Sequence, residues 1–418
     1  MLITTRSRPA TTDRTKTVGR TSLVASPILL LLVGTLPLAF NSSTCAQMAK
    51  PRITAARQSA LTWTRLPDLP DPLGVAGPFI GVHKGVLVVA GGANFPRPIW
   101  ESQKLWRRKI HVLIRQGTQY KWIDGGALPI PIAYGAAIST DKGIICLGGN
   151  RDATTFDRVF ALHWDPASKR VTQLDYPPLP RPCAYGQATL IGDILYLAGG
   201  QHGAGLDSAM ANLWALDLAG AAPPASRTWR ILPPCPGGQR AFNLTVSQNN
   251  GADDCLYVIS GRRQGHDGVQ FLRDTWEYNV RLRKWRRRAD APHCVMAGTA
   301  IAAANGNVVI LGGADGTLFD KADVLKDRHP GFPRQAWQFD TAANSWSSAG
   351  ATPQNHVTTH AVRFGAHVVV ASGEIRPRVR SPWVWQIQLP GVAAKADAQD
   401  SSERPISHGG PRYVSTAR

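Results

Sequence analysis

Short apolar runs recur along the chain, and each of them ends in a pair of small residues. The runs are VLVVAGG ending at Gly92, GIICLGG at Gly149, ILYLAGG at Gly200, CLYVISG at Gly261, NVVILGG at Gly313 and HVVVASG at Gly373. They follow one another at intervals of about 50 to 60 residues, which is the range of structural repeats. The pattern predicts six copies of one structural unit, each containing a buried strand that ends in a small-residue pair.

Further strands are predicted on both sides of each apolar run. A tryptophan lies about 30 residues before five of the six closing glycines, at Trp63, Trp122, Trp229, Trp285 and Trp346, and Val171 takes this position in the remaining repeat. A second strand precedes each run, and another follows each pair, as in RVFALHWD (158–165) and DTWEYNV (274–280). Turn residues separate these segments, so we expect four antiparallel strands per unit. The glycine pairs suit positive φ angles and close backbone packing.

Four-stranded units with a glycine pair resemble the repeats of kelch β-propellers. The resemblance covers residues 62–389 and implies an all-β fold with six blades. The segment LTWTRLPDLP enters as an outermost strand, whereas SPWVWQIQLP leaves as a third strand. We therefore expect Trp63–Leu66 to complete the last blade and to cover its open edge.

The two ends of the chain differ from the repeats. Residues 1–48 combine basic residues with an apolar run over 23–40, which predicts a signal peptide and export to the periplasm or the cell exterior. A retained membrane anchor and lipid attachment at Cys45 are the alternatives. No later stretch is apolar enough to cross a bilayer. Residues 393–418 are polar and are expected to form a disordered tail.

Charge and cysteine content narrow the range of partners. The chain of 418 residues has a formal net charge of +19, which favours anionic ligands. The basic segment RLRKWRRR (281–288) is interpreted as a solvated edge, because nucleic acid does not suit an exported protein. The widely spaced cysteines form no CxxC pair, so no zinc site is predicted, and Cys235–Cys255 is the one disulfide to test.

One carboxylate stands out at the end of the sixth run. In a propeller, the residues that follow the small pairs line one mouth of the central channel. These residues are Ala93, Asn150, Gln201, Arg262, Ala314 and Glu374. Only Glu374 is acidic, and Arg376, Arg378 and Arg380 follow it closely. A functional carboxylate and a structural ion pair at the rim are both compatible with this pattern.

The segment GEIRPRVR around Glu374 resembles a motif of the bacterial N-acetylneuraminate epimerases, the sialic acid mutarotases. The resemblance implies that Glu374 is the proton acceptor and that Arg380 is the arginine of the motif. Arg376 stands where the family has lysine, and Arg378 replaces a glycine. GGANFPRPIW (91–100) and the AYG at 133–135 resemble two other segments of that family. Their order along the chain differs, which implies a circular permutation.

The resemblance leads to a functional hypothesis, a mutarotase that interconverts the anomers of an acidic sugar, most simply N-acetylneuraminate. Proton transfer by Glu374 needs no metal and no cofactor. Arg380 is expected to bind the sugar carboxylate, and Arg97, Arg262, Arg376 and Tyr134 are further substrate-binding candidates. Other side chains that precede inner strands are weaker candidates: Tyr185, Asn243, His293, His356 and His360.

Two other functions remain open from the sequence. A propeller of this kind can bind a carbohydrate or a protein without turning it over. A copper enzyme resembling galactose oxidase shares the repeat but requires a Tyr/His/Cys copper constellation, and no segment of this chain resembles one.

Overall fold

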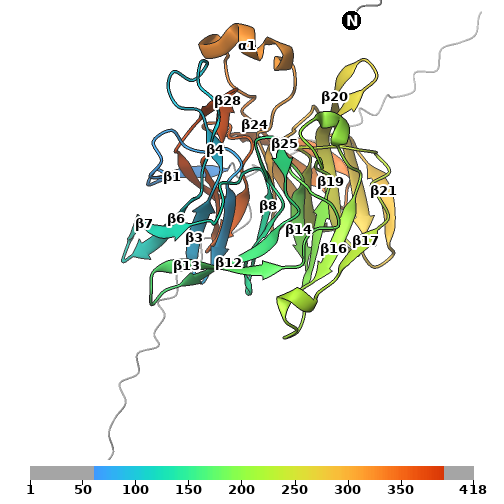
Figure 1. The fold of residues 1–418 in the computed structure, drawn as a ribbon. Helices are drawn as coiled ribbons and strands as arrows, with labels where there is room; N and C mark the ends of the chain where they lie inside the picture. Colours follow the sequence, from blue (N-terminus) through green and yellow to red (C-terminus); the bar gives the residue numbers. More distant parts are fainter. Residues whose placement is uncertain (1–60, 390–418) are drawn as a thin grey trace, which may run out of the picture. The chain divides into compact units, whose positions relative to one another are not determined.

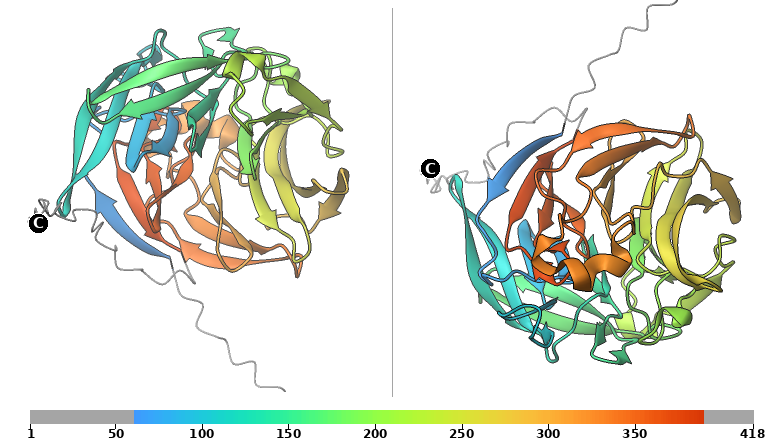
Figure 2. Two further views of the ribbon diagram at one scale, coloured as in Figure 1. Left: turned by 90° about the horizontal axis from the view of Figure 1, so that it is seen from below. Right: turned by 90° about the horizontal axis from the view of Figure 1, so that it is seen from above.

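The computed structural model describes residues 61–389. The predicted signal peptide at 1–48 and tail at 393–418 lie outside these residues. The described residues form six four-stranded antiparallel sheets arranged as blades around a central axis, as Figures 1 and 2 show. The predicted six-bladed β-propeller is therefore confirmed.

Each blade runs from an inner strand at the axis to an outer strand at the rim. Blade 1 consists of β2 (Phe79–His83), β3 (Val86–Ala90), β6 (Lys109–Gln116) and β7 (Gln119–Ala127). Blade 2 consists of β8 (Ala136–Thr140), β9 (Gly143–Leu147), β12 (Val159–Asp165) and β13 (Arg170–Tyr176). Blade 3 consists of β14 (Gln187–Ile191), β15 (Ile194–Ala198), β16 (Leu213–Asp217) and β17 (Trp229–Leu232). Blade 4 consists of β18 (Leu244–Asn249), β19 (Asp254–Gly265), β20 (Gly268–Asn279) and β21 (Lys284–Arg288). Blade 5 consists of β22 (Thr299–Ala302), β23 (Asn307–Leu311), β24 (Gln335–Asp340) and β25 (Ser345–Ala351).

Blade 6 combines the two ends of the described chain. It consists of β26 (Ala361–Phe364), β27 (His367–Ala371), β30 (Val384–Gln388) and β1 (Thr62–Leu66). β1 pairs with β30 in a register that sets Thr62 opposite Gln388 and Leu66 opposite Val384. The predicted closure of the last blade by the N-terminal strand is confirmed.

Smaller elements lie in the connections. The two-stranded hairpins pair β4 (Ala93–Asn94) with β5 (Leu105–Trp106), β10 (Asn150–Arg151) with β11 (Thr154–Thr155), and β28 (Glu374–Arg376) with β29 (Val379–Arg380). The helical turns are η1 (Leu206–Ser208), η2 (Pro224–Ser226), η3 (Phe319–Lys321), α1 (Ala322–Leu325) and η4 (Lys326–Arg328). Within residues 61–389, no helix has the length and apolar character needed to span a membrane.

Six backbone hydrogen bonds join the blades around the axis. One residue before each inner strand donates its N–H to the carbonyl of the equivalent residue in the preceding blade, over 2.6 to 2.8 Å. These residues, which we call the axial ring, are Gly77, Tyr134, Tyr185, Phe242, Ala297 and Thr358. All six have φ between 54° and 64°, in the left-handed region. The axial ring closes on itself, because Gly77 donates to Thr358.

The small-residue pairs lie where the backbone is most crowded. Both residues of each pair have positive φ, from 58° to 71° at the first position and from 95° to 123° at the second. A Cβ on Gly148 would lie 2.0 Å from the Cys183 carbonyl oxygen, so this position excludes every other residue. In blade 6, serine takes the first position of the pair, and its hydroxyl makes hydrogen bonds to the backbone. Ser372 Oγ accepts from Val75 N–H at 2.8 Å and donates to a backbone carbonyl.

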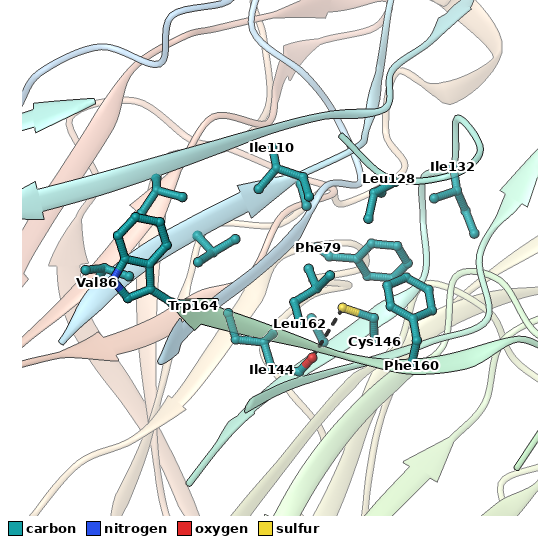
Figure 3. Packing of buried hydrophobic residues seen from close by; sticks show 14 residues of the cluster. Phe79, Val86, Ile110, Leu128, Ile132, Ile144, Cys146, Phe160, Leu162 and Trp164 are labelled. Atoms are coloured by element: carbon teal, nitrogen blue, oxygen red, sulfur yellow. Dashed lines mark hydrogen bonds between the residues drawn. The ribbon is translucent and has the colours of Figure 1, made fainter. Parts of the chain in front are cut away.

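The hydrophobic core is divided among the interfaces between blades. Figure 3 shows the cluster between blades 1 and 2, where Phe79 of β2 packs against Phe160 of β12 with 5.5 Å between ring centroids. The recurring tryptophans also join neighbouring blades. The indole N–H of Trp122 donates to the Pro67 carbonyl at 2.8 Å, and Trp229, Trp285 and Trp346 make the same type of bond. This bond accounts for four of the five recurring tryptophans, whereas the buried indole N–H of Trp63 has no hydrogen-bond partner among residues 61–389.

The suggested Cys235–Cys255 disulfide is wrong. All five cysteines among the described residues are buried free thiols. Cys255 packs in the core between blades 4 and 5, whereas Cys235 packs in the core between blades 3 and 4. The two side chains therefore lie on opposite faces of the blade 4 sheet and cannot meet.

The closure of blade 6 by β1 is expected to be a major source of stability. Removing residues 1–66 takes away five paired residues and the packing of Trp63 and Leu66, and it exposes the edge of β30. We expect the free energy of unfolding to fall by about 3 kcal/mol or more, or the protein to aggregate. Urea denaturation measures this change. A chain that starts at residue 61 is the matched control, and equal stability of the two truncations would contradict the closure.

Candidate functional site

The residues that follow the small pairs form a second layer on top of the axial ring. Each is joined by a β-bridge to the residue just before a ring residue: Ala93 to Ala76, Asn150 to Ala133, Gln201 to Ala184, Arg262 to Ala241, Ala314 to Met296 and Glu374 to Val357. Because the ring residues are neighbours around the axis, this second layer surrounds the same mouth of the channel. Glu374 therefore lies at the axis.

Glu374 begins the β28–β29 hairpin, and its two carboxylate oxygens differ in their surroundings. Oε1 accepts a hydrogen bond from the Arg378 backbone N–H at 2.7 Å and one from Arg380 Nη1 at 3.2 Å. Oε2 has no hydrogen-bond partner among residues 61–389. The side chain keeps 17% of its area exposed, so it is fixed by one oxygen while the carboxylate remains accessible.

Arg380 connects the carboxylate to two other parts of the site. Its side chain is 3% exposed, and each of its three nitrogens donates to a protein acceptor. Besides Glu374, these acceptors are the Ala93 carbonyl at 3.3 Å from Nε and the Tyr134 hydroxyl at 3.3 Å from Nη2. Burial lowers the pKa of Arg380, but Glu374 and Tyr134 outweigh this effect, so the pKa is raised overall and the guanidinium stays charged.

A pocket of about 500 Å³ lies beside Glu374, between blades 4 to 6 and the segment 315–333. This volume falls within the range of small-molecule sites. Its walls include Phe242 of the axial ring, Met296, Phe319 and Phe332. The segment 315–333 contains α1, which lies over the central part of the propeller in the right-hand view of Figure 2. The pocket therefore has largely apolar walls, and Glu374 lies at one edge.

Arg262 is the basic side chain of the pocket wall. Its guanidinium lies between the rings of Phe242 at 4.3 Å and Phe319 at 4.9 Å. In the described part of the chain it makes no side-chain hydrogen bond, and its Nε is a buried donor without a partner. Burial lowers the pKa of Arg262, while Tyr185 and Glu374 oppose this effect. Arg262 is thus a rigidly held cation whose hydrogen-bonding capacity is unused.

The other predicted residues lie at different distances from this pocket. Arg376 donates to Asp327, to the carbonyl at 2.7 Å and to a carboxylate oxygen at 3.0 Å, and so ties η4 to the β28–β29 hairpin. Arg97 is exposed and is not part of the pocket wall. Tyr134 belongs to the axial ring and packs against Tyr185 in a tilted arrangement, with 4.9 Å between centroids. Only Glu374 and Arg262 of the predicted set line the pocket.

Aromatic side chains narrow the axis beneath the pocket. Tyr185 lies between Tyr134 and Phe242, whose centroid is 4.3 Å away. Burial raises the pKa of the Tyr185 hydroxyl. The space at this level is only about 40 Å³, enough for a water molecule or two. A ligand of sugar size can therefore reach Glu374 only from the face that carries α1.

Sequence reasoning missed two parts of this site. The axial ring carries no repeated residue type, since its members range from glycine to tyrosine, so no motif marks it. The segment 315–333 carries none of the repeated residue types, although its Leu318, Phe319 and Phe332 form part of the pocket wall. Among residues 61–389, no group of three or more His, Cys, Asp or Glu side chains is arranged to hold a metal ion.

Comparisons with known proteins agree with the motif resemblance. The sequence model of the N-acetylneuraminate epimerase family matches residues 176–329. The N-acetylneuraminate epimerase of Yersinia enterocolitica is 27% identical over 246 residues, which cover 53% of this chain and 59% of the relative. That of Haemophilus influenzae strain 86-028NP is 33% identical over 106 residues, covering 22% and 27% respectively.

A solved structure entitled "Structure of YjhT" shares the fold. It superimposes with a TM-score of 0.54 at 16% identity and covers 75% of this chain and 94% of that one. The chain matches between about a quarter and three fifths of the length of the first curated relatives. The predicted resemblance to the epimerases is confirmed. The family match ends before Glu374, so it does not extend to the candidate carboxylate.

Two buried histidines near the axis predict a pH dependence of stability. Burial lowers the pKa of His356 to about 3 and that of His360 to about 4, although a contact with the Gly135 carbonyl opposes the latter shift. Both stay neutral in the folded protein while they protonate near pH 6.5 once unfolded. Stability is therefore fully present above pH 6.5 and is lost as the pH falls toward about 4.

Between pH 6 and pH 5, the two histidines together should reduce the free energy of unfolding by about 2 kcal/mol. Urea denaturation at the two pH values measures this change. In His360→Gln the loss should be about half as large. A loss that is unchanged in both His360→Gln and His356→Gln would show that other groups cause it.

Proposed function

We propose that this protein is a sugar mutarotase, which interconverts the anomers of an acidic sugar such as N-acetylneuraminate, with Glu374 as the proton-transfer residue. The single observation that carries the proposal is the environment of Glu374. One carboxylate oxygen is fixed by Arg380 and by a backbone N–H, the other has no hydrogen-bond partner within residues 61–389, and the side chain lines a pocket of about 500 Å³. The resemblance to the N-acetylneuraminate epimerases supports the substrate class.

A single carboxylate suffices for this reaction. Glu374 takes the proton from the anomeric hydroxyl, the bond between the anomeric carbon and the ring oxygen breaks, and the ring oxygen receives the proton. The freed carbonyl carbon turns over, and the reverse steps close the ring from its other face. Each proton returns to the sugar, so no co-reactant is consumed.

The two buried arginines have different roles in this proposal. Arg380 orients Glu374, because its nitrogens already donate to Glu374, Tyr134 and Ala93. Arg262 binds the carboxylate of the sugar, because its guanidinium lines the pocket and has no protein partner in the described chain. A planar guanidinium between two aromatic rings presents a fixed pair of donors to a carboxylate.

Two further sequence predictions are kept as parts of the proposal. Export from the cytoplasm fits the N-terminal pattern of residues 1–48. A circular permutation relative to the epimerases would leave the ring of blades intact and change only where the chain is cut. It would also account for matches to the relatives that extend over only part of the chain.

Replacing Glu374 with Gln tests the base. The change keeps size and hydrogen bonding but removes the proton acceptor, so anomer exchange should slow by roughly 10² to 10⁴-fold. Proton NMR measures the rate at which freshly released α-anomer converts to β-anomer above the spontaneous rate. The matched control is Glu277→Gln, a buried carboxylate of β20 in blade 4.

Two outcomes would contradict the proposal. If Glu374→Gln exchanged the anomers as fast as the unchanged protein, Glu374 would be only a structural partner of Arg380. If the unchanged protein bound N-acetylneuraminate without accelerating exchange, the protein would be a carbohydrate-binding propeller and not a mutarotase.

Lysine substitutions separate the two arginine roles. Arg262→Lys should raise KM about tenfold or more with kcat nearly unchanged, because an ammonium loses the paired donors to the sugar carboxylate. Arg380→Lys should mainly lower kcat, because the link from Tyr134 to Glu374 is broken. Steady-state kinetics of anomer exchange provide both constants. If Arg262→Lys mainly lowered kcat and Arg380→Lys mainly raised KM, Arg380 would bind the sugar carboxylate and Arg262 would act in catalysis.

A further inference from the structure

Three cations surround one aromatic ring on the blade 1 side of Glu374. Phe95 lies in the segment between β4 and β5. Arg378 Cζ lies 4.3 Å from its ring centroid, Arg380 Cζ 4.8 Å and Lys104 Nζ 5.8 Å. Cations gathered around one ring repel one another unless an anion lies close to them. The arrangement therefore needs either a carboxylate of the protein or an external anion.

Among residues 61–389, a carboxylate pairs with only one of these cations. Arg380 pairs with Glu374 at 3.2 Å. Arg378 donates from Nη2 to the Ser102 carbonyl at 2.9 Å, and its Nε has no partner in the described chain. Lys104 makes neither a hydrogen bond nor an ion pair with any residue of 61–389. Two half-buried positive charges therefore remain unneutralised at this mouth.

Aromatic faces hold these two cations in place without neutralising them. Lys104 Nζ lies 5.2 Å from the ring of Trp106 and 5.1 Å from that of Tyr134, and Arg378 lies 5.5 Å from that of Trp100. Contacts of this kind fix the position of a cation but leave its N–H donors free. Lys104 and Arg378 are thus preorganised donors for an oxyanion.

This pair of cations is separate from Arg262. Lys104 belongs to the segment that follows β3 in blade 1, whereas Arg262 follows the small pair of blade 4. Blades 1 and 4 are three steps apart in a ring of six, so they lie on opposite sides of the axis. Lys104 and Arg262 thus approach the mouth from opposite sides.

We propose that Lys104 and Arg378 bind a second carboxylate, that of a sugar acid linked to the sugar whose anomeric carbon lies at Glu374. The preferred ligand is then a linked pair of sugar acids, or a longer chain of them, with its reducing end in the pocket. This inference rests on the proposed function for the orientation of the ligand. The attached sugar occupies a hydroxyl other than the anomeric one, because exchange requires a free anomeric hydroxyl.

Binding measurements test the second carboxylate position. Isothermal titration would compare N-acetylneuraminate, a linked dimer of N-acetylneuraminate, and the neutral disaccharide lactose. The unchanged protein should bind the dimer at least about tenfold more tightly than the single sugar, since hydrogen bonds to a charged group contribute that much. Lactose should bind more weakly than either.

A double variant provides the residue-level test. Lys104→Gln with Arg378→Gln should reduce the preference for the dimer to about twofold or less. The matched control is Lys121→Gln with Arg230→Gln, which removes the same charge from exposed positions on outer strands and should keep the full preference. Melting temperatures of both variants exclude unfolding as the cause.

The outcomes separate this inference from the proposed function. A preference for the dimer that disappears only in the Lys104/Arg378 variant supports the inference, even if anomer exchange is absent and the mutarotase proposal fails. Equal binding of the dimer and the single sugar by the unchanged protein would overturn the inference, even if exchange is fast. Equal loss of the dimer preference in both double variants would also overturn the inference. The net positive charge of the protein alone would then explain why the dimer binds more tightly.

Discussion

The axial ring of six backbone hydrogen bonds is the constraint on which the rest of the structure depends. It forces one residue of every blade into the left-handed region, and five of the six are not glycine. Such a conformation costs about 1–2 kcal/mol for each of these residues. The blades offset this cost jointly, because each bond links two neighbouring blades. The ring therefore sets the radius of the channel, and β1 closes blade 6 at the outer edge, away from the ring.

The chemistry of the mouth follows from this geometry. β-bridges attach Glu374 and Arg262 to the residues that precede two ring residues, so both side chains are fixed relative to the axis. Glu374 then lies among several cations and pairs with Arg380, whereas Asp315, the other carboxylate of the pocket wall, accepts hydrogen bonds from Thr317. An excess of positive charge remains at Arg262, Lys104 and Arg378, which have no carboxylate partner in the described chain. An anionic ligand completes this balance of charge.

The sequence predicted those parts of the protein that depend on repeated residue types. Apolar runs ending in glycine pairs identified the blades because a Cβ at positions such as Gly148 has no room. Glu374 was found because a single carboxylate among six equivalent positions is conspicuous. The contacts of Arg376 with Asp327 and of Arg378 with Phe95 were not predictable, since both depend on how two loops far apart in the chain fold over one another.

The loops that form the site are distinct from the blades that form the fold, so the chemistry of the site can differ between proteins with the same fold. The segments 95–104, 315–333 and 374–380 all leave the ring of blades directly after small-residue pairs, and together they supply the pocket wall and the cations. Because the ring holds their starting points, these segments can change without disturbing the blades. A shared fold at 16% identity therefore constrains the substrate less than these three segments do.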